Sequence, residues 1–280
     1  MIPIPRILPW LLLAVLFAAL AGSGWQSWHQ ARAYEQVTRE IVHQLEAEQL
    51  LDNSGERLLE LLSFGLYDGY TRQLERLEQA KQRQAEHRRA VQRATQLFFA
   101  LAGAILLLAW LIRRRPGDLG YAALGVALVA LVVGLTTPIL SLEASRELPV
   151  IGQTLFQFQS KGVLSSIQAL RGHGDLWLAL LLFLFSVLLP TLKTLVALLT
   201  LFSRSHSLSL HGLRLSRHLG KWSMADVFVV ALLVVFFSTD QPGGLTHAEI
   251  QAGLWFFAAY VVLSLVGSQL IAASWPDPAS

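Results

Sequence analysis

The chain is dominated by long apolar stretches separated by shorter polar segments. About six of them approach the ~17–25 residues that a membrane-spanning helix needs. They are Ile7–Gly24, Leu97–Ile112, Leu119–Leu140, Leu176–Phe202, Met224–Thr239 and Gly253–Ala273. In hydrocarbon each backbone polar group has to be satisfied within its own segment, which favours helices. The pattern predicts an all-α integral membrane protein with about six transmembrane helices.

The first apolar stretch has two interpretations. Ala19-Leu20-Ala21 fits the small-x-small pattern of a signal-peptide cleavage site. The aliphatic run is long, however, and Trp25 and Trp28 follow it where an interfacial aromatic belt is expected. We favour an uncleaved anchor, and in both cases residue 30 lies on the far side of the membrane.

Residues 26–95 are dense in Glu, Gln, Arg and Ala, which are good helix formers. Apolar residues recur there at helical spacing, as in Val37, Ile41 and Leu45, and in Tyr70, Leu74 and Leu77. Turn signals occur at Asp52-Asn53-Ser54-Gly55 and around Gly65 and Gly69. This pattern predicts a helical hairpin outside the membrane. It is either a water-exposed spacer or a docking or sensing surface.

Composition supports the membrane interpretation and narrows the chemistry. Hydrophobic residues make up 54% of the chain and charged residues only 15%, against about 25% charged in soluble domains. The net charge of +3 comes from basic residues in the loops between spans, so we expect no nucleic-acid partner. Cysteine is absent, which excludes disulfides and thiolate metal sites.

Loop charges orient the spans, because short cytoplasmic loops carry excess Lys and Arg. Arg113-Arg114-Arg115 forms one basic turn, and the loop from Ser203 to Lys221 is basic without any acidic residue. The loop after Thr239 has Asp240 and Glu249 but no Lys or Arg. We therefore expect cytoplasmic N- and C-termini. Arg88, Arg89 and Arg93 run against this trend, because they lie on the outer side. They belong to a long segment, however, and the charges of long loops have little influence on topology.

These features divide the chain into four parts. We expect an N-terminal anchor, a periplasmic helical hairpin, a second transmembrane helix with its basic turn, and a four-span membrane domain. Their predicted bounds are 1–25, 26–95, 96–115 and 116–280.

Lys193 is the most informative ionisable residue, because charges inside spans usually face a bundle interior or a watery cavity. It follows Pro190, which removes a backbone hydrogen bond and kinks a helix. Ser186, Pro190 and Lys193 share one helical face, flanked by Thr194. The alternative is that Lys193 reaches the headgroups, about 14 Å away at 1.5 Å per residue. We favour a functional polar face.

Asp226 lies near the start of the fifth span, in Trp222-Ser223-Met224-Ala225-Asp226. One interpretation is an acidic residue in a first helical turn, with Ser223 as the cap. The other is a partner for Lys193 across two antiparallel spans, which would neutralise two buried charges. As candidates for a lipid groove or charge pair we take Ser186, Pro190, Lys193, Thr194, Trp222, Ser223, Met224 and Asp226.

Other motifs indicate no further chemistry. His206, His211 and His218 share a loop without clustered acidic residues, so solvated histidines are favoured over a metal site. The sequence has no glycine-rich phosphate loop, no GxSxG and no HExxH. We therefore expect no enzymatic activity, no metal and no cofactor. Small residues in the spans, such as Ala123, Ala127, Ser264 and Ser268, are typical of helix packing.

Three segments together resemble the paraquat-inducible protein A family: Gln159–Leu164, Phe183–Lys193 with its P-x-x-K, and Gly220–Val230 with W-S-M-x-D-V-F. The resemblance covers about Leu119 to Ala273. It implies a tetraspanin-like four-helix membrane module in the bacterial inner membrane. It also implies phospholipid as cargo and a periplasmic mammalian-cell-entry (MCE) domain protein as partner. Pro190, Lys193, Trp222, Ser223, Met224 and Asp226 match motif positions.

The chain departs from the family pattern in several places. Without cysteine it cannot form the zinc ribbon of many relatives, and it has one module where many have two. Ser238 stands where relatives often have a lysine. The first two spans and the hairpin lie outside the family module. We therefore keep two functions open: a lipid-transport subunit important for envelope integrity, or a membrane sensor or assembly scaffold. A membrane enzyme acting on lipid or quinone is not favoured, because no acid–base set converges.

Overall fold

The computed structural model describes residues 8–50, 69–148, 152–200 and 246–274. Five helices within these ranges are long and apolar enough to cross a membrane. They confirm the expected all-α integral membrane protein. The predicted span Met224–Thr239 lies outside the described residues.

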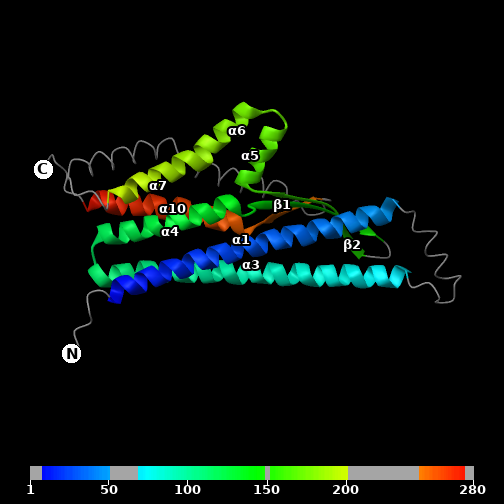
Figure 1. Ribbon diagram of the computed structural model, residues 1–280, viewed down its shortest axis with the longest axis horizontal. Coiled ribbons are helices and arrows are strands. Elements are labelled where there is room, and N and C mark those ends of the chain that lie inside the picture. Colours follow the sequence, from blue (N-terminus) through cyan, green and yellow to red (C-terminus); the bar gives the residue numbers. More distant parts are fainter. Residues whose placement is uncertain (1–7, 51–68, 149–151, 201–245, 275–280) are drawn as a thin grey trace.

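Two long helices, α1 (Leu8–Leu50) and α3 (Gly69–Arg113), lie side by side along the length of the molecule (Figure 1). Each runs without a break across the change between apolar and polar sequence, so α1 continues through residue 25 and α3 through residue 95. The arms of the expected hairpin are therefore helical. The turn predicted at Asp52–Gly55 lies outside the described residues.

The polar parts of α1 and α3 are held together by a small apolar cluster and by side-chain hydrogen bonds. Ile41 packs against Ala80 and is 2% exposed. The Gln84 amide donates to the Thr38 hydroxyl at 2.8 Å, and His87 Nδ1 lies 2.7 Å from Gln30 Oε1. Such contacts across the pair keep the arms together where water competes for polar groups.

The centre of the molecule is the contact between α4 (Pro116–Thr136) and α10 (Ala252–Ala273), where glycines allow the backbones to approach closely. A Cβ on Gly120 would lie 2.8 Å from the Gly267 carbonyl oxygen, and one on Gly134 would lie 2.8 Å from the Phe257 nitrogen. Small residues at helix contacts are typical of membrane bundles. The expected packing residues Ala123, Ala127 and Ser264 are buried here.

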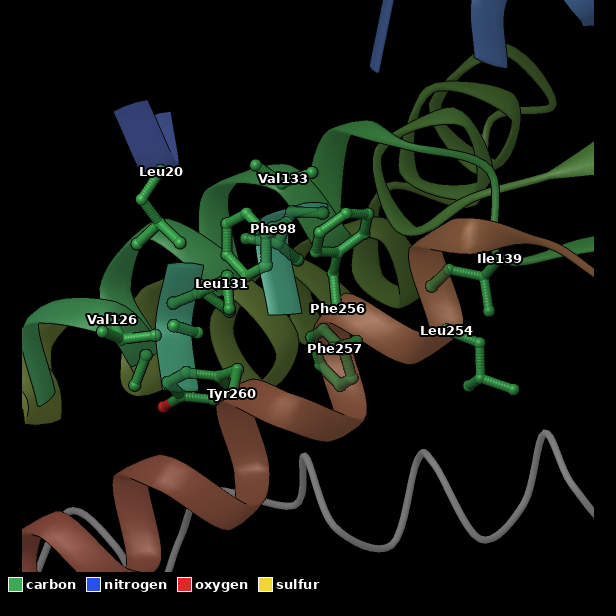
Figure 2. Close-up of a cluster of buried hydrophobic side chains, with 14 of the residues drawn as sticks. Leu20, Phe98, Val126, Leu131, Val133, Ile139, Leu254, Phe256, Phe257 and Tyr260 are labelled. Carbon is green, nitrogen blue, oxygen red and sulfur yellow. The ribbon is translucent and has the colours of Figure 1, made fainter. Parts of the chain in front are cut away.

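Aromatic side chains join α3 to this pair of helices. Figure 2 shows Phe98 from α3 pointing toward Phe256 of α10 and Leu131 of α4. The Phe98 and Phe256 ring centroids are 4.8 Å apart, edge to face. Leu20 of α1 is fully buried in the same cluster. The two N-terminal spans thus share one core with the helices that follow.

The next span is built from three consecutive pieces. These are α6 (Leu176–Phe183), a π-helical turn (Leu184–Leu188) and α7 (Leu189–Leu199). The short helix α5 (Val163–Gly172) precedes the span and is joined to it by the turn at Gly174.

A three-stranded antiparallel sheet lies at the end of the bundle opposite the Arg113–Arg115 turn (Figure 1). The strands are β1 (Leu140–Leu148), β2 (Gly152–Lys161) and β3 (Thr246–Ile250), in the order β2-β1-β3. Leu140 pairs with Lys161 and with Ile250. We call this end of the bundle the sheet end and the other the basic end.

Candidate functional site

The break in the α6–α7 span is centred on Pro190. Proline has no backbone N–H, and its ring clashes with the carbonyl four residues earlier, here that of Ser186. The π-helical turn Leu184–Leu188 lies directly before it and contains Ser186, which is 4% exposed. Single π-helical turns within helices often occur at functional sites. The kink predicted from Pro190 thus takes the form of a widened helical turn.

Two hydroxyl groups converge on the Pro190 carbonyl. Thr194 Oγ1 donates to the Pro190 oxygen at 2.9 Å, and the Tyr260 hydroxyl donates to the same oxygen at 3.1 Å. Thr194 Oγ1 and the Tyr260 oxygen are 3.4 Å apart. Both side chains are 1% exposed. Thr194 and Tyr260 therefore form a closed polar cluster with Pro190, which joins α7 to α10 inside the bundle.

The structure brings together only part of the predicted site. Pro190 and Thr194 lie in the cluster, Ser186 is buried one turn earlier, and Lys193 is half-buried beside Thr194. The other four predicted residues lie outside the described residues, so the proposed Lys193–Asp226 pair stays a prediction. They are Trp222, Ser223, Met224 and Asp226.

Tyr260 is the residue that sequence reasoning missed. It lies within Ala252–Ala273, where the apolar pattern alone marks a span. A signal was available, because a buried tyrosine hydroxyl normally has a hydrogen-bond partner and the middle of a span offers few. The partner is Pro190, which is 70 residues away in the sequence. The sequence alone therefore could not show which residue Tyr260 pairs with.

A separate cavity of about 500 Å³ lies at the sheet end between α3, α10 and β3. Arg88 of α3 forms an ion pair with Glu249 of β3 at its rim. Ala31 and Tyr34 of α1 and Trp255 of α10 also line it. The cavity thus lies where the polar hairpin meets the end of the membrane bundle. Among the described residues, no group of three or more His, Asp or Glu side chains is placed to hold a metal ion.

Comparison with protein families shows which family this chain belongs to. The family model described as paraquat-inducible protein A matches residues 120–275, more than half of the chain. The chain belongs to the paraquat-inducible protein A family. The resemblance inferred from three short segments is thereby confirmed. Comparisons with curated proteins and with solved structures gave no match.

The paraquat-inducible protein A match begins at Gly120 in the first turn of α4 and ends just after α10. The family module therefore includes the sheet, α5, the π-helical turn and the hydroxyl cluster. Helices α1 and α3 lie outside it, yet their residues Leu20 and Phe98 are part of its core. In this chain the N-terminal pair is an integral part of the packed structure.

Replacing Tyr260 with phenylalanine is expected to lower the unfolding free energy by about 0.6–1.7 kcal/mol, the range for interhelical hydrogen bonds in membranes. The change removes the only side-chain hydroxyl reaching Pro190 from α10 among the described residues. Thermal unfolding of the purified protein in detergent measures this. Thr191→Val is the matched control, because the Thr191 hydroxyl bonds to Val187 within its own helix. Equal effects of both changes would contradict a role for the interhelical bond.

Proposed function

We propose that this protein is an inner-membrane subunit of a system that moves phospholipids between bacterial membranes, with a periplasmic MCE-domain protein as partner. The observation that carries the proposal is the buried hydroxyl cluster at the break in the α6–α7 span, within a paraquat-inducible protein A module. The proposal assigns no enzymatic step, cofactor or metal to the chain.

A broken span suits a helix that moves relative to its neighbour. Helix kinks at proline and at π-helical turns are recurrent bending points. The Pro190 carbonyl has two hydroxyl donors, Thr194 on its own helix and Tyr260 on α10. Loss of the Tyr260 bond would leave the Thr194 bond in place, so α7 can tilt away from α10 without leaving this carbonyl unsatisfied. Such a movement would open the module to lipid.

We propose that Lys193 acts on the lipid phosphate. It follows Pro190 by three residues and is half-buried beside the cluster. A lysine ammonium binds phosphate as a point charge, and lysines within spans usually face a bundle interior or a watery cavity. We propose that Lys193 attracts the headgroup when α7 tilts, and that Asp226 completes the charge balance.

The basic end is proposed to face the cytoplasm, because Arg113–Arg115 lie there. The sheet end and the hairpin then face the periplasm, with both termini inside. At 1.5 Å per residue, the 43-residue α1 is about 64 Å long, roughly twice the ~30 Å hydrocarbon thickness. The hairpin would therefore extend far into the periplasm, where an MCE-domain partner is reached.

Affinity purification of the tagged protein in mild detergent tests the proposal, with mass spectrometry of co-purifying proteins and lipids. We expect an MCE-domain protein and retained phospholipid. Tagged Tyr260→Phe protein is the control for opening at the cluster. It should keep the partner but lose phospholipid to the detergent more readily, because the bond that holds α7 to α10 is gone. Recovery of neither partner nor lipid with the intact protein would contradict lipid transport.

A membrane sensor or assembly scaffold is the second candidate function. The observation that favours it is the Arg88–Glu249 ion pair, which ties the hairpin to β3 of the family module. Movement of the hairpin would be transmitted to the sheet through this contact. A preparation free of both MCE-domain protein and phospholipid would favour this function.

A further inference from the structure

An apolar groove lies between α1 and α4 toward the sheet end. It has a volume of about 390 Å³ and is lined by Trp25 and Trp28 of α1 and by Val129 and Val132 of α4. Trp25 and Val132 are 64% and 56% exposed, so the groove opens sideways toward the surrounding lipid. An acyl chain matches the chemistry of such walls.

A polar pocket of about 130 Å³ adjoins this groove. The two share Thr136, and Arg32 of the pocket lies one helical turn beyond Trp28 of the groove. The pocket is lined by residues of α1, the end of α4, β2 and α5: Arg32, Glu35, Leu135, Thr136, Thr137, Pro138, Ser160, Gly162, Leu164, Ser165 and Gln168. The apolar and polar parts therefore follow one another along α1 and α4, as the chain and headgroup of a lipid do.

Two buried polar atoms at this site have no hydrogen-bond partner among the described residues: Thr137 Oγ1 in the polar pocket and Trp28 Nε1 along the groove. Thr137 is 1% exposed. A buried polar group without a partner costs about 1–3 kcal/mol, so such groups are rare unless a ligand or water satisfies them. Both atoms therefore have hydrogen-bonding capacity that a polar ligand at the site could satisfy.

The polar pocket is lined by one basic and one acidic side chain, Arg32 and Glu35. The Arg32 guanidinium lies over the Trp28 ring, 4.5 Å from its centroid. The Glu35 carboxylate is engaged by Arg39 on the next turn of α1. An arginine held against an aromatic ring keeps its N–H groups available, and arginine binds phosphate through two parallel hydrogen bonds.

We infer that the groove and pocket together bind one membrane phospholipid. Its phosphate lies against Arg32 and the Thr137 hydroxyl, and one acyl chain lies along the tryptophans between α1 and α4. Because the site lies where α4 ends and the sheet begins, it is at headgroup depth. The site uses α1, which is outside the family module, and it is separate from the hydroxyl cluster. This inference does not depend on which of the two proposed functions is correct.

Photolabelling of the full chain in lipid-free detergent tests the site, with a phosphatidylethanolamine probe that carries a diazirine on its acyl chain. We expect labelled peptides from 21–28 and 128–136. Arg32→Gln and Thr137→Val should each reduce this labelling at least about five-fold, as expected for a loss near 1 kcal/mol or more. Arg89→Gln is the matched charge control, because Arg89 is an exposed α3 residue that lines neither the groove nor the pocket. Labelling of the lipid-facing side of α10 serves as the internal reference.

The competitors and the stability of Thr137→Val complete the test. Unlabelled phosphatidylethanolamine should displace the probe, whereas diacylglycerol and inorganic phosphate should not. Thr137→Val should unfold no earlier than the unmodified protein in lipid-free detergent, because it removes an unsatisfied hydroxyl. Equal displacement by diacylglycerol, displacement by inorganic phosphate alone, or labelling that ignores Arg32 and Thr137 would each overturn the inference.

Discussion

Replacing Gly134 with valine is expected to lower the unfolding free energy by about 3 kcal/mol, the upper end of the usual cost of overpacking. A Cβ at this position would lie 2.8 Å from the nitrogen and 3.1 Å from the Cα of Phe257. These are backbone atoms, so no side-chain rotation relieves the clash and α4 must separate from α10. For a chain of this size the loss corresponds to a fall in midpoint temperature on the order of 6–12 °C.

Gly103→Val is the matched control for this prediction. Gly103 lies within α3, and a Cβ there would have no atom within 4 Å. The same chemical change should therefore leave the midpoint temperature nearly unchanged. Both variants are measured by thermal unfolding in the same detergent. Similar midpoints for the two would mean that the close approach of α4 and α10 does not stabilise the protein.

Lys193→Met is expected to reduce lipid transfer about 10- to 100-fold while leaving the protein level unchanged. A hydrogen bond to a charged group is worth about 1.5–3 kcal/mol, and each 1.4 kcal/mol is a factor of ten. Methionine keeps an unbranched apolar chain and removes the charge proposed to attract the lipid phosphate. Envelope integrity in the presence of detergent, together with the protein level in the membrane, measures the effect.

Two further variants separate charge from packing at this position. Leu195→Met introduces the same residue on the same helix at a site that is 41% exposed, and it should behave like the unmodified protein. Lys193→Arg keeps the positive charge and should restore part of the activity. An intact envelope with Lys193→Met at normal protein level would remove Lys193 from the mechanism and leave the hydroxyl cluster without a charged partner.

Within the part of the chain that the structure describes, the predicted and observed spans agree because each depends on a local property. A run of apolar residues crosses a membrane whatever its neighbours are, so Leu176–Leu199 and Ala252–Ala273 were readable from the chain alone. The same is true of the break at Pro190, which lacks a backbone donor. Short local sequence motifs were also sufficient to identify the family.

The long-range contacts between these elements could not be predicted from local sequence. Tyr260 reaches the Pro190 carbonyl across 70 residues of sequence, and Arg88 meets Glu249 across 161. The continuity of α1 from membrane anchor to polar arm also escaped the sequence, because a change in polarity resembles a boundary even when the helix continues.

By itself, the sequence determined a multi-spanning membrane protein, its family, and the place where one span breaks. Only the tertiary structure decided that α1 lies against α4 with Arg32 and Thr137 lining one pocket, and that Tyr260 closes the cluster at Pro190. The physical reason is the distance along the chain over which each effect acts. Hydrophobic length and proline sterics act within a few residues, whereas a pocket or an interhelical hydrogen bond requires distant segments that only the packed bundle brings together.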